Sequence, residues 1–199
     1  MKVTLIEEKD QHTSRWSGGT TTELYILPAG SKYQNRDFIL RLSTATIEEE
    51  KSVFTKLPAI RRILSVLEGE VAIQHGNGPR LFLKAGEIHA FGGDEDTVSW
   101  GQCRDFNVMV KPGLQVDLRV YKAGQLPPAW PADFVSHFFY AYRGEYSLQC
   151  DGTDCRIPEK ALLYLPRADR RFSLLGPTTD EALLVHVSYQ AENGKRPAE

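Results

Sequence analysis

Arg62–Glu70 reads RILSVLEGE, a short β-type run of apolar residues that ends in Gly-Glu. Such an ending is typical of a strand that turns sharply into the next one. When the sequence is slid against itself, Gly69–Gln74 (GEVAIQ) lies over Gly144–Gln149 (GEYSLQ), an offset of 75 residues (144 − 69). At the same offset the apolar pattern continues where identity is lost. The sequence therefore predicts two similar β units in tandem.

Short β-type runs separated by turn residues fill the rest of the chain. No apolar period of 3.6 residues persists long enough for an amphipathic helix, so the sequence indicates an all-β sandwich or barrel. The expected strands of the first half, besides the central run, are Val3–Ile6, Leu24–Leu27, Asp37–Ile47 and Arg104–Val110. Those of the second half are Val116–Tyr121, Val135–Tyr142, Tyr146–Cys150, Ala161–Leu165, Arg171–Leu175 and Ala182–Tyr189.

The expected domain boundary follows Lys111-Pro112-Gly113. Residues 1–113 form the first unit. Residues 114–190 hold a Pro-rich linker, AGQLPPAWPADF, and the second unit. The polar residues 191–199 are expected to be a frayed tail.

Composition argues against several classes of function. Hydrophobic residues make up 41% of the 199 residues and charged residues 25%, and the net charge of −2 offers no attraction to nucleic acid or to an anionic membrane. No run approaches the ~20 apolar residues of a membrane span, and the N-terminus has no apolar signal region. We expect a cytoplasmic protein. Cys150 and Cys155 flank an expected hairpin turn and either face each other or, with Cys103, are free thiols; a reducing cytosol favours free thiols.

Two expected strands each carry a pair of polar residues on one face. Period-2 geometry places Arg41 with Ser43 on one face of the first, and Asp105 with Asn107 on one face of the second. Arg62 lies on the central run. These side chains face either water or a cavity, and in a closed barrel they can meet in the interior, with Asp105 as the partner of one arginine.

Trp16, Gly18 and Gly19 precede a Thr-rich strand that includes Glu23. Two glycines beside a Trp can bring backbone N–H groups close to a ligand, and the alternative is a plain loop with a core Trp.

Read in order, several motifs resemble the HutD/Ves family of the cupin superfamily. They are Trp16–Gly19, Phe38–Ser43, Phe54-Thr55, Arg62–Gly69 and Asp105–Met109. The resemblance implies a bicupin, with two jelly-roll barrels at residues 1–113 and 114–190, and a family without an established activity whose name links some members to histidine utilisation. The chain departs from the family pattern in having Ala59-Ile60-Arg61-Arg62 where many relatives have Gly-x-Asp-Arg, and in a shorter stretch after the Trp. The family's motif positions fall on Trp16, Gly18, Gly19, Glu23, Arg41, Ser43, Arg62, Asp105 and Asn107.

No metal or cofactor is expected. Metal-dependent cupins use a His-x-His pair, a Glu and a further His, because a catalytic metal needs three or four converging ligands. Here only Gly86–His89 matches, and only the last of these elements. His89 is therefore interpreted as a structural or surface residue, and His137 and His186 as satisfied core residues.

Two classes of function stay open. One is a binding module for a small anionic metabolite, with arginines that hold a carboxylate. The other is a metal-independent isomerase or epimerase, with Asp105 or Glu23 as base and Arg41 or Arg62 steadying an oxyanion. The binding module is preferred because no His or Tyr is placed as a second proton carrier, and no catalytic residue is assigned. A regulatory role and a homodimer are left open.

Overall fold

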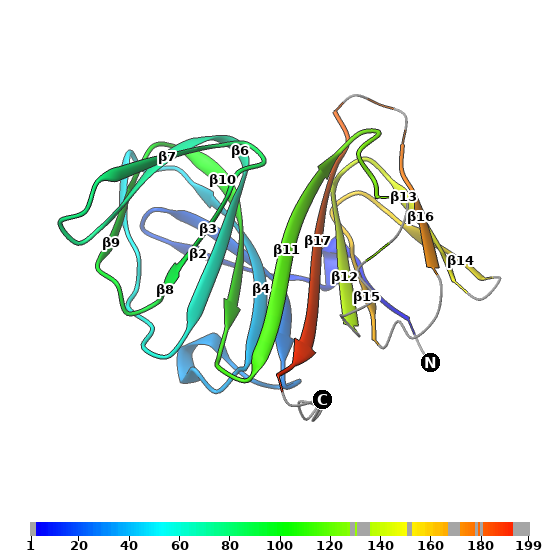
Figure 1. Cartoon of the computed structure of the whole chain (residues 1–199), viewed down its shortest axis with the longest axis horizontal. Helices are drawn as coiled ribbons and strands as arrows, with labels where there is room; N and C mark the ends of the chain where they lie inside the picture. The colour runs from blue at the N-terminus through cyan, green and yellow to red at the C-terminus, as the bar shows by residue number, and fades with distance from the viewer. Residues whose placement is uncertain are drawn as a thin grey trace. The chain divides into compact units, whose positions relative to one another are not determined.

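The computed structural model describes residues 3–127, 130, 136–150, 153–166, 172–177, 179 and 181–192. The chain is all-β, as predicted (Figure 1). The described helical segments are two short 3-10 turns, η1 (Glu8–Asp10) and η2 (Tyr33–Asn35). In the part of the chain so described, no helix has the length and apolar character needed to cross a membrane.

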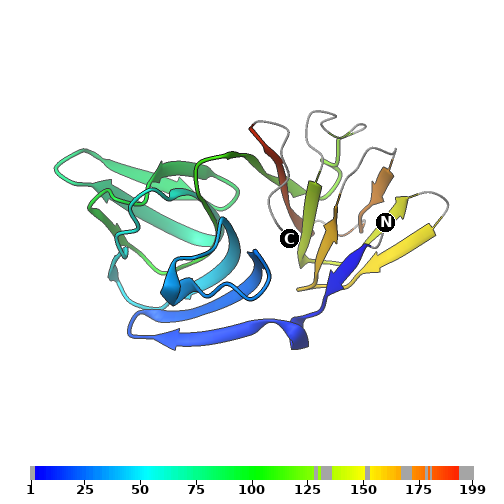
Figure 2. The same ribbon diagram turned by 90° about the horizontal axis from the view of Figure 1, so that it is seen from below.

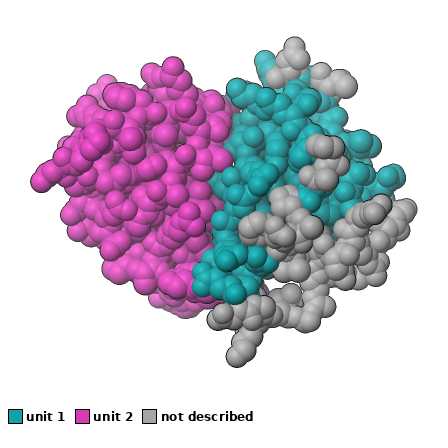
Figure 3. All heavy atoms as spheres, in the orientation of Figure 1, with its two compact units in different colours: residues 1–11, 114–196 teal, residues 12–113, 197–199 magenta. Residues whose placement is uncertain are grey.

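The chain divides into two compact units, coloured separately in Figure 3. Unit 2 comprises residues 12–113 with 197–199, and unit 1 comprises residues 1–11 and 114–196. The first eleven residues, expected in the first unit, therefore lie in the other one. The reason is strand pairing, because β1 (Thr4–Ile6) joins β15 (Leu162–Leu165) in an antiparallel ladder (Figure 2).

Unit 2 is built around one sheet with the strand order β2-β3-β4-β10-β6-β9-β5, and β7 and β8 also pair with β6. Its strands are β2 (His12–Trp16), β3 (Gly19–Leu27), β4 (Leu40–Ile47), β5 (Lys51–Val53), β6 (Arg61–His75), β7 (Arg80–Lys84), β8 (Ile88–Gly92), β9 (Thr97–Trp100) and β10 (Cys103–Val110). β4 begins three residues later than expected. The Asp37 carboxylate accepts a hydrogen bond from the Lys32 N–H (2.8 Å) and so belongs to the preceding loop.

β6 does not end at Gly69, contrary to the expected turn. Its first half pairs with β10 and β8, and its second half with β7 and β9. At the change of partners Gly69 has φ +76, and a Cβ there would lie 2.7 Å from the Gln102 carbonyl oxygen. Glycine thus lets one strand bend and serve two ladders.

Unit 1 contains a five-stranded sheet of order β1-β15-β12-β17-β11 and a three-stranded sheet of order β14-β13-β16. Its remaining strands are β11 (Leu114–Lys122), β12 (Ser136–Arg143), β13 (Tyr146–Cys150), β14 (Thr153–Ile157), β16 (Phe172–Leu175) and β17 (Leu183–Ala191). Val135, Arg171, most of the second half of the expected linker and residues 193–199 of the expected tail lie outside the described residues.

The tandem repeat is visible in the topology. The order β15-β12-β17-β11 corresponds to β8-β6-β10-β4, and β12 covers the residues 75 positions after the first half of β6. The pairing register also shifts at one place in each of two equivalent ladders. In the β10–β6 ladder the shift lies between Arg104 and Asp105, and in the β17–β12 ladder it lies between Ala141 and Arg143. Both units therefore follow one strand plan.

Separate apolar clusters stabilise the two units. In unit 2, Leu64, Val66 and Ile73 of β6 pack with Phe91, and a second cluster surrounds Phe38. In unit 1, the core includes residues from β12, β13, β15 and β17: Phe139, Ala141, Tyr146, Leu148, Leu163, Leu165 and Leu184. Within the described residues, Cys103, Cys150 and Cys155 form no disulfide; Cys150 stands opposite Thr153 and Cys155 opposite Leu148.

Candidate functional site

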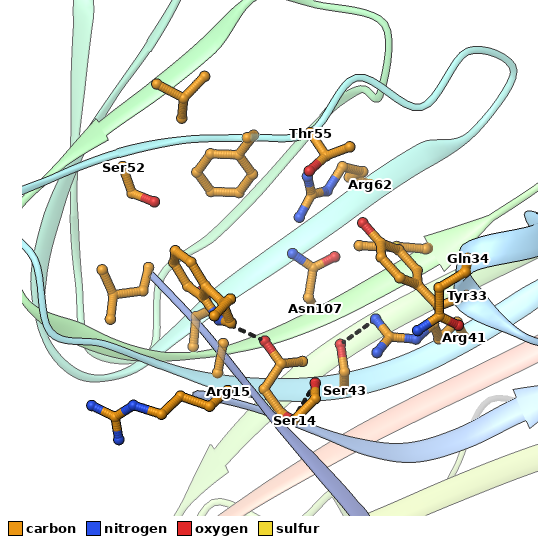
Figure 4. A pocket seen from close by; sticks show the side chains of 18 residues that line it. Ser14, Arg15, Tyr33, Gln34, Arg41, Ser43, Ser52, Thr55, Arg62 and Asn107 are labelled. Atoms are coloured by element: carbon orange, nitrogen blue, oxygen red, sulfur yellow. Dashed lines mark hydrogen bonds between the residues drawn. The ribbon is translucent and has the colours of Figure 1, made fainter. Parts of the chain in front are cut away.

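A pocket of ≈ 430 Å³ lies within unit 2 (Figure 4). It contains five of the polar residues singled out in the sequence, together with Trp16. Its lining consists of Ser14, Arg15, Trp16, Thr21, Tyr33, Gln34, Arg41, Ser43, Ala45, Ile47, Ser52, Val53, Phe54, Thr55, Arg62, Asp105, Asn107 and Met109.

Strand register brings the polar residues together. β10 lies between β4 and β6, and Met109 stands opposite Arg41 on one side and Arg62 on the other. Two residues along β10, Asn107 stands opposite Ser43. Because directly opposed residues share a face of the sheet, these side chains converge on one cavity. Both faces of β10 are buried, so the polar face meets the cavity rather than bulk water.

Arg41 is buried and already has an anionic partner. Its Nε donates to Glu23 Oε2 (2.7 Å), its Nη1 donates to Ser43 Oγ (3.2 Å), and its Cζ lies 4.6 Å from the centre of the Tyr33 ring. Glu23 does not line the pocket; it stands opposite Ser43 on β3 and is about one-quarter exposed (24%). The positive charge of Arg41 is therefore compensated within the protein.

Arg62 is equally buried, but its charge is not compensated by contact. Its Cζ lies 4.5 Å from the Phe54 ring centre and 5.4 Å from that of Phe91. Its Nε has no hydrogen-bond partner, and in the described part of the chain Arg62 forms no ion pair. Burial lowers the pKa of Arg62 to about 10, which the charge of Asp105 partly opposes. The guanidinium is thus a cation without a contacting anion.

Asp105 is the buried acid of the pocket. We expected Asp105 to pair with one of the two arginines, but among the described residues it forms no ion pair. Arg41 pairs with Glu23 instead. Burial raises the pKa of Asp105 to about 7, while the charge of Arg62 and a hydrogen bond from the Ala45 backbone act in the opposite direction. Its Oδ1 has no hydrogen-bond partner.

Asn107 supplies a second unused acceptor. Its Oδ1 is buried and has no hydrogen-bond partner, and its side chain lies between Arg62 and Ser43 in the pocket (Figure 4). Among the buried atoms of the residues in this polar wall, one donor, Arg62 Nε, and two acceptors, Asp105 Oδ1 and Asn107 Oδ1, have no hydrogen-bond partner. Buried groups of this kind are normally satisfied, so the wall is suited to a polar ligand.

Trp16 forms part of the pocket wall, whereas Gly18 and Gly19 do not line the pocket. Trp16 Nε1 donates to Thr21 Oγ1 (3.2 Å). A Cβ on Gly18 would lie 2.1 Å from Cζ3 of the Trp16 ring, and one on Gly19 would lie 1.9 Å from the Thr46 carbonyl oxygen. The glycine pair therefore allows close packing of Trp16 and of β3 against β4; it is not part of the wall.

Comparison with known proteins identifies the family. The HutD family model matches residues 8–183. This chain belongs to the HutD family. Two similar solved structures are the conserved protein PA5104 of Pseudomonas aeruginosa PAO1 (21% identity, TM-score 0.79) and HutD of Pseudomonas fluorescens SBW25, determined in a formate condition (19%, 0.73). Each comparison covers 96% of this chain and 100% of the other.

More distant structures share the cupin-like fold. Bacterial pirin YhhW of Escherichia coli, in complex with nickel(II), has 12% identity and a TM-score of 0.65, with 94% of this chain and 98% of that chain covered. No curated protein matches the sequence of the HutD-family chain.

Sequence reasoning missed several wall residues of the HutD-family pocket. Tyr33 and Gln34 lie at η2, in a polar loop without periodicity, and Ser52 and Val53 belong to the short β5. Phe54 was noted only as part of a family motif; its contact with Arg62 depends on strands that approach in three dimensions. The exposed strand β2, which carries Ser14 and Arg15, has no apolar alternation that could have indicated it.

Four of the five histidines of the HutD-family chain form two pairs, His75 with His89 and His137 with His186. His89 is half-buried rather than isolated, with its Nε2 2.8 Å from His75 Nε2. His137 and His186 are buried core residues, as expected, with Nδ1 and Nε2 2.9 Å apart, although His186 Nδ1 has no hydrogen-bond partner. Within the described ranges, no three His, Cys, Asp or Glu side chains are grouped as metal ligands.

Proposed function

We propose that this HutD-family protein is a metal-free binding protein whose unit 2 pocket takes a small carboxylate metabolite. The observation that carries the proposal is Arg62, a buried guanidinium whose Nε has no partner in a pocket of ≈ 430 Å³. Buried charges in proteins are normally paired, and a carboxylate is a natural partner for a guanidinium. Arg41 does not compete for the ligand, because Glu23 holds it at 2.7 Å.

The walls support a ligand with an apolar body. Trp16, Tyr33 and Phe54 contribute aromatic rings to the lining, while the polar groups lie on β4, β6 and β10. A few fixed polar groups within an aromatic wall are the usual composition of a small-molecule site.

The bicupin architecture is part of this proposal. The matching strand orders of the two units support it, as does the similarity to cupin-like structures. A regulatory role in histidine utilisation rests on the family name alone, and we retain it, together with a cytoplasmic location and a homodimer, as part of the proposal.

Replacement of Arg62 tests the proposal. Screening 3-phenylpropionate, glutarate and other small carboxylates by thermal shift, followed by calorimetry, should give at least one ligand. Arg62→Gln should then weaken binding by about 1.5–3 kcal/mol, the value of a hydrogen bond to a charged group. Arg61→Gln is the matched control, because Arg61 is the exposed neighbour on the same strand. Equal affinity in wild type and both variants would reject Arg62 as the anchor.

One observation favours a second candidate, a metal-independent enzyme. The pKa of Asp105, raised to about 7 by burial, is that of an effective general base at neutral pH. Glu23, the other candidate base, does not line the pocket, and its carboxylate accepts a hydrogen bond from Arg41. NMR of any bound carboxylate in D₂O distinguishes the two functions: proton exchange or product formation that Asp105→Asn abolishes would favour the enzyme.

A further inference from the structure

The pocket wall contains both a hydrogen-bond donor and hydrogen-bond acceptors that have no partner. Arg62 offers a donor, whereas Asp105 Oδ1 and Asn107 Oδ1 are acceptors. The two acceptors are two residues apart on β10 and so project from the same face, beside the row in which Met109 stands opposite Arg62. A simple carboxylate contains no donor and would leave both acceptors unsatisfied.

The charges of the pocket lead to the same requirement. Arg41 and Glu23 neutralise each other, and Arg15 pairs with Glu48, which leaves Arg62 and Asp105. A bound monoanion neutralises Arg62 but leaves an ionised Asp105 buried without a contacting cation, which is costly. Such a ligand would require Asp105 to take up a proton. A ligand that also carries a positive charge would leave Asp105 ionised and paired.

We infer that the ligand of the proposed carboxylate site, on which this inference rests, is an amino carboxylate. Its carboxylate pairs with Arg62, and its protonated nitrogen donates hydrogen bonds to the side-chain oxygens of Asp105 and Asn107. This assignment satisfies the unused donor and both unused acceptors, and it gives a site without net charge. The aromatic wall residues Trp16, Tyr33 and Phe54 then contact the side chain of the ligand.

Matched pairs of acids that differ only in the amino group test the inference. We would measure the dissociation constants of L-phenylalanine and 3-phenylpropionate, and of L-glutamate and glutarate, by calorimetry. In wild type, the amino acid of at least one pair should bind at least about tenfold more tightly than its partner, as expected for an added charged hydrogen bond. In Asp105→Asn this preference should fall below about threefold, because the amino acid loses its anionic partner and the desamino acid no longer requires proton uptake by residue 105.

Proton exchange on binding is a second measurement that needs no variant. The charged and titratable groups that interact with Asp105 are Arg62 on β6 and, on its own strand, the thiol of Cys103. The other titratable side chains that line the pocket are Arg15 on β2, Tyr33 in the loop and Arg41 on β4, which pairs with Glu23 on β3. Calorimetry near pH 7.5 in two buffers of different ionisation enthalpy should show proton uptake with the desamino acid. With the amino acid it should show no uptake but a small release, because Asp105 is still partly protonated at that pH and the bound cation ionises it.

The outcomes separate the two proposals. Equal or weaker binding of the amino acid in every pair, or a preference that survives Asp105→Asn, overturns the inference and leaves the carboxylate site standing, provided that Arg62→Gln weakens binding. Failure of every acid to bind, or binding insensitive to Arg62→Gln, overturns the carboxylate site and the inference together.

Discussion

Arg41 and Arg62 are buried to the same extent, yet only one of them contacts an anion. The Glu23 carboxylate accepts a hydrogen bond from Arg41 and neutralises its charge, whereas the aromatic rings beside Arg62 provide no anionic acceptor. At the scale of single residues, the buried part of the pocket therefore combines Arg41, whose charge is neutralised, Arg62, which contacts no anion, and Asp105, whose pKa burial raises to about 7.

Asp105 should make stability depend on pH. Its folded pKa of about 7 lies above the unfolded value of about 3.9, so the folded state retains a proton that the unfolded state releases. The stability that protonated Asp105 provides is thus present below about pH 4 and lost as pH rises to about 7. The free energy of unfolding of wild type minus that of Asp105→Asn should fall across this range in urea titrations. A pH-independent difference would contradict the raised pKa.

Glu23→Gln should destabilise the protein, because it leaves the buried Arg41 without its anion. We expect a loss of about 1–3 kcal/mol in the free energy of unfolding, less than for a fully buried pair because Glu23 is partly exposed. Glu48→Gln is the matched control. It removes the exposed ion pair with Arg15 (3.2 Å) and should cost less than about 0.5 kcal/mol. Equal losses in denaturant titrations would show that Arg41 does not depend on Glu23.

At the scale of elements, the β2–β3 hairpin positions Trp16 and β3 carries Glu23. The hairpin turns at Ser17 and Gly18, and Gly19 begins the pairing of β3 with β4 at Ile47. The backbone at Gly19 approaches the Thr46 carbonyl so closely that no side chain fits. The element thus supplies a wall residue and the partner of Arg41 from one short segment.

Gly19→Ala should test this close approach. A Cβ at 1.9 Å from backbone oxygen forces β3 away from β4, so we expect a loss of about 2–4 kcal/mol in stability, in the range of overpacked and strained sites. Gly30→Ala is the matched control, since Gly30 also has positive φ (+86) but open space around it. Similar losses in thermal and urea unfolding would attribute the effect to φ alone.

Period-2 alternation was sufficient to place Arg41 with Ser43 and Asp105 with Asn107 on shared faces, and the 75-residue offset was sufficient to predict the repeat. Alternation within a strand does not determine which strands are neighbours, so the pairing of Arg41 with Glu23 was not predictable. Alternation also did not reveal that β6 continues through Gly69. A glycine with positive φ can lie in a bend within one strand as well as in a turn between two strands. The loop residue Tyr33 gave no periodic signal at all.

At the scale of the whole molecule, matching strand registers assign a counterpart in unit 1 to each of the five polar pocket residues on β4, β6 and β10. His137 stands opposite Ser188 as Arg62 stands opposite Met109, so His137 is the counterpart of Arg62. Two residues before Met109 and Ser188 lie Asn107 and His186, which are therefore counterparts as well. In unit 1 this position is filled by the chain itself. The Trp130 ring centre lies 4.8 Å from that of His186, 5.1 Å from that of Phe139 and 5.7 Å from that of Phe172.

Trp130→Ala should therefore create a void in unit 1. We expect a loss of about 2–4 kcal/mol in the free energy of unfolding, below the full range for a buried Trp because Trp130 is partly exposed. Calorimetry with whichever of the acids named above binds the wild type should give the wild-type affinity, since every wall residue of the pocket belongs to unit 2. A large loss of affinity would contradict that separation.

The filling of unit 1 by Trp130 has an evolutionary consequence. If the shared strand plan of the two units comes from duplication of one unit, the proposed ligand constrains only the unit whose pocket is open, and the other unit can exchange its polar groups for apolar packing. Across the HutD family, positions 41, 43, 62, 105 and 107 are therefore expected to change more slowly than their unit 1 counterparts 117, 119, 137, 184 and 186.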